Sequence, residues 1–198
     1  MGLDLNYING QTPLDEDEKE GLILKTITTR KELDEQEQLN IDESKVWLLK
    51  TKLNLDKILN EEFIKQLHSK MFENVWRWAG SFRNSNKNIG VDKFEIPVQV
   101  RQLIDNAKYW IENKTFPEEE IAIRFGHRLV QIHLFPNGNG RHSRLIADVL
   151  MSKGFNKEEF TWGSTNLSAD GTVRASYLNA LKIADDRSFS DLIKFAKS

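Results

Sequence analysis

The chain of 198 residues contains no cysteine. This absence excludes disulfide frameworks, zinc sites with thiolate ligands and cysteine nucleophiles, and it is compatible with a reducing compartment. An excess of one charge is also missing, because 28 Lys and Arg residues stand against 30 Asp and Glu residues and leave a formal net charge of −2. Since no chain-wide positive field exists to hold phosphate backbones, we expect no general binding of nucleic acid.

Long apolar runs are absent as well. No stretch reaches the roughly 18 consecutive apolar residues of a membrane span. The N-terminal sequence is acidic and lacks the basic and apolar regions of a secretory signal. We therefore expect a cytoplasmic protein with no membrane partner. Hydrophobic residues make up 39% of the chain, enough for the core of one domain that spans residues 1–198.

Most of the chain shows the spacing of amphipathic helices, in which apolar residues recur at three- and four-residue steps. This spacing predicts one or two helices over residues 29–50 and further helices over 60–80, 98–111 and 118–132. From Ser81 to Pro97, Asn, Gly and β-favouring residues replace it, which predicts a short β-hairpin. We therefore expect a mainly α fold, a helical bundle with a short β-hairpin flap.

The segment most informative about function is HLFPNGNGRHSR, which runs from His133 to Arg144 and leads into helical spacing. Its glycines allow a tight turn and a helix start near Asn139 or Gly140, where unpaired N–H groups and the helix dipole attract anions. Arg141 and Arg144 share one helix face and can add charge-assisted hydrogen bonds to phosphate oxygens. His133 precedes this cradle, where a neutral imidazole can act as general base. Together these features indicate phosphoryl or nucleotidyl transfer.

Three structural interpretations compete with this functional one. The letters NGNG alone favour a β-hairpin turn, although helical rather than alternating spacing follows them. Arg144 can pair with Asp148 four residues later, an arrangement that needs no function. Zinc binding through His127, His133 and His142 is a third alternative, but their spacing matches no metal signature.

The motif resembles the signature of the Fic/Doc family, H-x-F-x-D/E-G-N-G-R-x-x-R, and departs from it only at Asn137. Similarity extends to HSKMFENVWRWAGSFRNSNKNIGVDKFEIP, to HRLVQIHLF and to the C-terminal RASYLNALKIADDRSFSDLIKFA. With the N-terminal TPLDEDEKEGLI and ELDEQEQLNI, the whole chain is most similar to the subgroup called mobile mystery protein B. The resemblance therefore covers about the full length.

The resemblance implies a Fic fold and the transfer of AMP from ATP to a hydroxyl side chain of a target protein. It implies a Fic core over residues 60–198, with the motif loop at 133–144, and a helical, regulatory N-terminal extension over residues 1–59. His133 would be the base that deprotonates the target hydroxyl. The flap at Lys87–Gly90 would lie beside the active-site loop and hold the target as an added strand.

The resemblance also assigns the phosphate contacts of ATP. Gly138, Asn139 and Gly140 would bind the α- and β-phosphates through backbone N–H groups, with the side-chain amide of Asn139 adding to them. Arg141 would hold the β-phosphate, and Arg144 would pair with the γ-phosphate.

Asn137 replaces the family's acidic residue, which binds the Mg²⁺ ion between the phosphates. An amide oxygen can still ligate Mg²⁺, but it lacks the negative charge that strengthens the bond. We therefore expect weakened Mg²⁺ binding. This leaves two alternatives to AMP transfer: a catalytically weak, toxin-like module that binds nucleotide and a partner, or a variant that uses another phosphate donor. Phe135 of the motif is expected to pack inward as a scaffold residue.

Self-inhibition is a further implication of the resemblance. Many members carry a helix with S/T-x-x-x-E-G/N, whose glutamate pairs with the second arginine of the motif. Here Glu20 and Gly21 match the last two letters, but Glu16 stands where Ser or Thr is expected. Two interpretations remain: Glu20 engages Arg144, or Glu20 is one acid on a solvated helix face that Gly21 ends.

Overall fold

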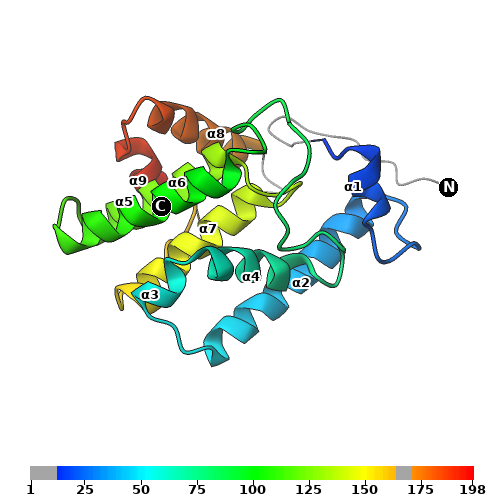
Figure 1. Cartoon of the computed structure of the whole chain (residues 1–198), viewed down its shortest axis with the longest axis horizontal. Helices are drawn as coiled ribbons and strands as arrows, with labels where there is room; N and C mark the ends of the chain where they lie inside the picture. Colours follow the sequence, from blue (N-terminus) through cyan, green and yellow to red (C-terminus); the bar gives the residue numbers. More distant parts are fainter. Residues whose placement is uncertain (1–12, 164–170) are drawn as a thin grey trace.

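The computed structural model describes residues 13–163 and 171–198, and within them the chain is mainly helical. No helix in these ranges is long and apolar enough to cross a membrane. Figure 1 shows the helices gathered into one bundle around α7. In chain order the elements are α1 (Glu16–Glu20), α2 (Arg30–Lys50), α3 (Leu55–Ile58), α4 (Glu61–Phe72), α5 (Ile96–Glu112), α6 (Glu118–Ile132), α7 (Asn139–Val149), the π-helical turn η1 (Leu150–Gly154), α8 (Gly171–Asp185) and α9 (Ser190–Ala196).

Capping residues explain where the long helices begin. The side chain of Thr29 accepts from the N–H of Glu32, whose carboxylate reaches back to the N–H of Thr29, so α2 starts in a capping box and continues as one helix. Asn60 caps α4 by accepting from the N–H of Glu62. Helix α4 ends at Phe72, earlier than the spacing predicts, and a series of turns leads from there to Gly80.

The main core joins α2, α4, α5, α6 and α7. Helix α7 packs against α6 on one side and α4 on the other, and α4 in turn packs against α2 (Figure 1). At the closest approach of α6 to α7, a Cβ on Gly126 would lie 2.8 Å from the backbone oxygen of Ser143, so only glycine fits there. A second, smaller core joins α8 and α9 to Ile123 of α6. The motif loop therefore lies between two helices of a rigid core.

The predicted β-hairpin between residues 81 and 97 is not found. Within the described ranges the only β pairing is an isolated bridge between Leu22 and Trp76. Instead, the guanidinium of Arg83 donates to the carbonyl oxygens of Ser85 and Val91. This side chain thus satisfies backbone groups from within the segment, and residues 81–95, here called the flap, form bends and turns.

Candidate active site

A loop of six residues connects α6 to α7, and left-handed backbone conformations mark both of its ends. His133 ends α6 with φ of 56°, and Gly138 precedes α7 with φ of 78°. A Cβ on Gly138 would lie 2.6 Å from the ring of Phe72, so both the backbone angle and the space require glycine. Helix α7 begins at Asn139, as predicted, which excludes the β-turn alternative for NGNG.

The loop is held in shape by its own side chains. The amide of Asn139 donates to the carbonyl oxygen of Phe135 at 2.8 Å and accepts from its N–H at 2.9 Å. The oxygen and one N–H of this amide are thus used inside the loop, so the expected side-chain contact with a phosphate would have to use the second N–H of the amide. Phe135 is fully buried, as predicted.

Asn137 also turns toward the loop itself. Its side-chain oxygen accepts from the N–H of Gly138 at 2.5 Å, and its backbone oxygen lies 3.0 Å from Nε2 of His68. The predicted metal ligand is therefore a neutral oxygen that already accepts one hydrogen bond. An amide oxygen has a second lone pair for a cation, but it lacks the negative charge that a carboxylate would add.

His133 is 6% exposed and faces the flap. Nε of Arg83 donates to its backbone oxygen at 2.6 Å, and a Cβ on Gly90 would lie 2.6 Å from its Cβ. Burial, and to a lesser degree the nearby positive charges of Arg83 and Lys87, lowers the pKa of His133 to about 4. The imidazole is therefore neutral at pH 7, which is the form that can accept a proton.

The two motif arginines have different surroundings. Arg141 donates to the buried carboxylate of Glu37 on α2 at 2.7 Å and lies over the ring of Phe72. The guanidinium carbon of Arg144 lies 5.1 Å from the ring centroid of Tyr177 on α8. Arg174, one turn before Tyr177, belongs to the same positive region: its pKa is lowered by burial first and then by three nearby guanidinium groups, those of Arg144, Arg30 and Arg141.

Two alternative pairings for Arg144 are not formed. Asp148 instead accepts hydrogen bonds from the indole N–H of Trp162, at 2.9 and 3.1 Å. Burial raises the pKa of Asp148 to about 7, although the Trp162 hydrogen bond acts in the opposite direction. Glu20 is exposed at the end of α1, and no ion pair among the described residues joins it to Arg144.

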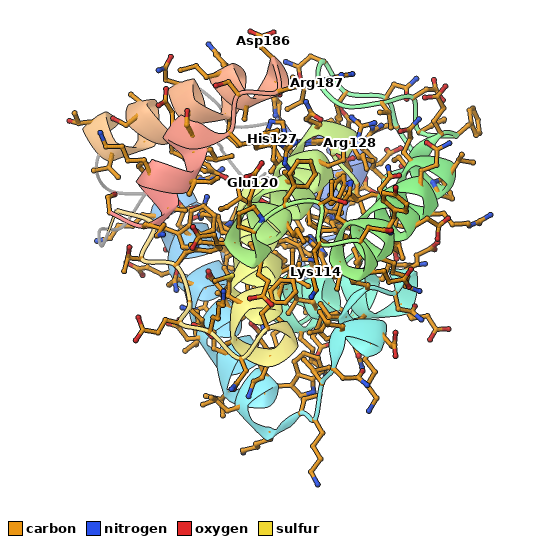
Figure 2. All side chains as sticks on the ribbon, turned by 90° about the vertical axis from the view of Figure 1, so that its left-hand side faces the viewer. Lys114, Glu120, His127, Arg128, Asp186 and Arg187 are labelled. Carbon is orange, nitrogen blue, oxygen red and sulfur yellow. The ribbon has the colours of Figure 1, made fainter. Side chains whose placement is uncertain are left out.

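The three histidines considered for zinc lie in separate places. Nε2 of His127 on α6 lies 3.0 Å from a carboxylate oxygen of Asp185, near the α8–α9 connection (Figure 2). His142 is buried with Nε2 2.9 Å from the backbone oxygen of Ile64, while His133 faces the flap. Within the described part of the chain, no group of three or more His, Asp or Glu side chains is placed to hold a metal ion.

Three residues around the site are not predicted from the sequence: Glu37, His68 and Arg83. Glu37 had a usable signal, because an acid at a core position between Leu33 and Ile41 of one helical stripe requires a buried partner. His68 likewise occupies a stripe position. Arg83 has no helical periodicity around it, and its role depends on contacts with residues about 50 positions away, so no local pattern reveals it.

Comparison with known proteins gives sequence matches to one family. A model of the Fic/DOC family matches residues 58–151. A curated relative, protein adenylyltransferase Fic of Aedes aegypti, is 24% identical over 170 residues, which are 83% of this chain and 32% of the relative. The chain thus spans about a third of that relative's length.

Solved structures agree in fold. The C. elegans Fic-1 structure, residues 134–508, has a TM-score of 0.67 and 19% identity, covering 83% of this chain and 48% of that one. The BepC protein of Bartonella tribocorum with bound AMPPNP has a TM-score of 0.65 and 15% identity, covering 92% and 97%. The N-terminal Fic domain of a Bartonella quintana protein with bound ADP has a TM-score of 0.65 and 13% identity, covering 87% and 86%. Residues 58–151 of this chain thus match the Fic/DOC family model, and the solved Fic structures share its fold.

Proposed function

We propose that the protein is an adenylyltransferase that moves AMP from ATP to a hydroxyl side chain of a target protein. The observation that carries the proposal is the neutral, buried imidazole of His133 at the end of α6, six residues before the N-terminus of α7. A proton acceptor and an anion-binding helix start thus share one short loop. The name of the mosquito relative and the nucleotides held by the two Bartonella structures support the same assignment.

The start of α7 is the proposed phosphate site. The first hydrogen bond of the helix runs from the N–H of His142 to the oxygen of Gly138, so the N–H groups of Asn139, Gly140 and Arg141 precede the helical ladder. These donors and the helix dipole favour the α- and β-phosphates. Arg141 would bind the β-phosphate either with its free N–H groups while it stays paired with Glu37, or after that ion pair breaks.

The positive region around Arg144 is the proposed site of the γ-phosphate. Arg144 of α7 and Arg30 of α2 lie near enough to Arg174 of α8 to lower its pKa, although Arg30 is also paired with Asp34 at 2.8 Å. Like charges held together in this way raise the local potential and attract a polyanion such as a triphosphate. The formal net charge of the whole chain is only −2, so this local field is not opposed by a strongly acidic chain.

Chemistry at the site follows from these positions. The oxygen of the target hydroxyl attacks the α-phosphorus of ATP while His133 accepts its proton, a new oxygen–phosphorus bond forms, and the bond to pyrophosphate breaks. Mg²⁺, when bound, neutralises phosphate charge. Among the described residues, the motif offers it only the neutral side-chain oxygen of Asn137, so its remaining ligands would come from nucleotide and water.

The flap is the proposed seat of the target segment. Gly90 touches His133, so a chain lying along Lys87–Gly90 would present its hydroxyl beside the imidazole. Ile89 and Phe94 are exposed, at 48% and 81%, and offer apolar contacts to that segment. Because the flap has no strand in this structure, pairing with the target backbone would have to form on binding.

Labelled ATP tests the proposed reaction. The purified protein is incubated with cell lysate and with ATP labelled at either the α- or the γ-phosphate. We expect protein-bound label from the α position only. Label from the γ position would instead identify a kinase-like reaction, and label from neither, with nucleotide binding intact, would favour a weakly catalytic binding module.

Replacing Asn137 by Asp tests the weakened metal ligand. We expect Asn137→Asp to increase Mg²⁺-dependent transfer about tenfold, because a carboxylate binds Mg²⁺ more strongly than an amide. Transfer is measured over a Mg²⁺ titration, and the expected change is a lower Mg²⁺ concentration at half-maximal rate. Overlapping titration curves for the two proteins would show that the missing charge does not limit the reaction.

The lowered pKa of His133 predicts an unusual pH dependence. The imidazole stays deprotonated, and so remains a base, as the pH falls from 7 toward about 4, whereas an ordinary histidine would be half protonated near pH 6.5. An NMR titration of the His133 ring in the free protein measures this directly, and kcat/KM should keep its value through pH 6. A ring titrating near 6.5 would contradict the prediction.

A further inference from the structure

His68 lies on α4 and is completely buried, yet both of its ring nitrogens are engaged. The N–H of Gly80 donates to Nδ1 at 3.0 Å, and Nε2 lies 3.0 Å from the backbone oxygen of Asn137. Because Nδ1 accepts a hydrogen bond, the ring proton sits on Nε2, which then donates to Asn137. One neutral tautomer thus links Gly80 to the motif loop.

The ring of His68 also supports the loop by packing. It stacks on Phe135 with a centroid separation of 3.7 Å and an angle of 19°. A Cβ on Gly138 would lie 3.2 Å from Nε2 of His68, so the turn before α7 rests directly on the ring. Phe135 and Gly138, which lie before and after Asn137 in the loop, are therefore both packed against one side chain that does not belong to the motif.

The hydrogen bond to Asn137 fixes a whole peptide plane. The carbonyl oxygen of Asn137 and the N–H of Gly138 belong to the same planar unit and point in opposite directions. Holding the oxygen against His68 therefore aims the N–H of Gly138 to the other side of the loop, where it meets the side-chain oxygen of Asn137. The orientation of this peptide unit, which comes directly before the proposed phosphate donors of Asn139, Gly140 and Arg141, thus depends on Nε2 of His68.

We propose that His68 is a positioning residue for nucleotide binding, which holds the loop before α7 in its phosphate-binding shape through the hydrogen bond from Nε2 to Asn137. This inference rests on the proposed function, because it names a residue that prepares the same site. Histidine suits this place better than an aliphatic residue, since it fills the core and provides a donor and an acceptor on opposite edges of one ring.

Two substitutions separate the two hydrogen bonds. The side-chain amide of Asn reaches the position of Nδ1, so His68→Asn keeps an acceptor for Gly80 and loses the donor to Asn137. The longer side chain of Gln reaches the position of Nε2, so His68→Gln keeps the donor to Asn137 and loses the acceptor for Gly80. Both variants remove the stacked ring, and any purely structural loss is therefore shared by the pair.

Affinity for ATP, thermal unfolding and the mobility of the loop amides are measured for both variants. We expect His68→Asn to bind ATP about tenfold more weakly than His68→Gln, the effect of losing one hydrogen bond that orders the site. The amides of Gly138, Asn139 and Gly140 should be more mobile in His68→Asn without nucleotide. Equal ATP affinities and equal loop mobility in the two variants would overturn the proposal.

A measurement on the unmodified protein keeps the inference testable if neither variant folds. Nitrogen NMR of the His68 ring reports which nitrogen carries the proton, and we expect a protonated Nε2 that remains so from pH 7 to 5. A proton on Nδ1 would sink the proposal. If the wild type binds no ATP, the proposed function fails, while the tautomer and the loop mobility still decide the role of His68.

Discussion

Replacing His133 by Ala should reduce transfer of labelled AMP by about 10²- to 10⁴-fold, the usual contribution of a positioned general base. His133 is the only motif residue whose side chain is neutral at pH 7, titratable and in contact with the flap. Its loss removes the proposed proton acceptor but leaves the N–H groups at the start of α7 in place. The measurement is a single-turnover rate with saturating ATP and target.

The control for this variant is nucleotide binding. Because the proposed phosphate donors lie on α7 rather than on His133, the Ala variant should bind ATP with nearly the wild-type affinity. A rate that persists with intact binding would show that another group accepts the proton. A parallel loss of binding would show that His133 shapes the loop, as its left-handed backbone also allows.

Gly138→Ala should destabilise the protein more than the same substitution at Gly140, the other glycine of the motif. Alanine at φ of 78° pays about 1–2 kcal/mol for the left-handed conformation. Its Cβ would also lie 2.6 Å from the ring of Phe72, and such overpacking typically costs about 1–3 kcal/mol. We expect a loss of roughly 2–5 kcal/mol in the free energy of unfolding, together with loss of ATP binding.

Gly140→Ala is the matched comparison for stability. Gly140 lies inside α7, and a Cβ there would meet only a nitrogen of Arg144, at 3.9 Å. Alanine in a helix is favoured over glycine by about 1 kcal/mol, so this variant should unfold at the wild-type denaturant concentration or above it. Equal destabilisation of both variants would show that the loss of stability does not come from the left-handed turn at Gly138.

The N-terminal helices share the core of the matched domain, which bears on any regulatory role for residues 1–59. Glu37 of α2 is 1% exposed, and its carboxylate joins Trp76 and Arg141, at 2.6 and 2.7 Å. Removing one partner of such a buried ion pair leaves an uncompensated charge. Arg141 is therefore paired with α2, whereas one interpretation of the sequence paired Glu20 with Arg144.

The α1 helix reaches the site by another route. Lys87 of the flap is almost wholly buried and pairs with Asp15 and Glu18, at 2.8 and 2.5 Å. Ser85 also donates to Asp15. Through these contacts α1 holds the flap, and through Arg83 the flap holds the backbone of His133. The position of the proposed base thus depends on segments more than 100 residues apart in the chain.

The sequence by itself determined the helices and the motif, because both are written in local signals. Apolar spacing places α2, α5 and α6, Thr29 and Asn60 mark helix starts, and the glycines before Arg141 mark the start of α7. These features depend on residues within one or two turns of each other, so a linear pattern contains them.

Only the tertiary structure decided what surrounds the motif. In the flap, the Arg83 guanidinium binds backbone carbonyls where the sequence predicts a hairpin. In the motif, Asn139 turns inward to Phe135, and Arg141 pairs with Glu37 of α2. The neutral state of His133 and the tautomer of His68 are likewise products of burial and of partners far away in sequence. Desolvation and long-range hydrogen bonds arise only when the helices pack, and no spacing of residues along the chain encodes them directly.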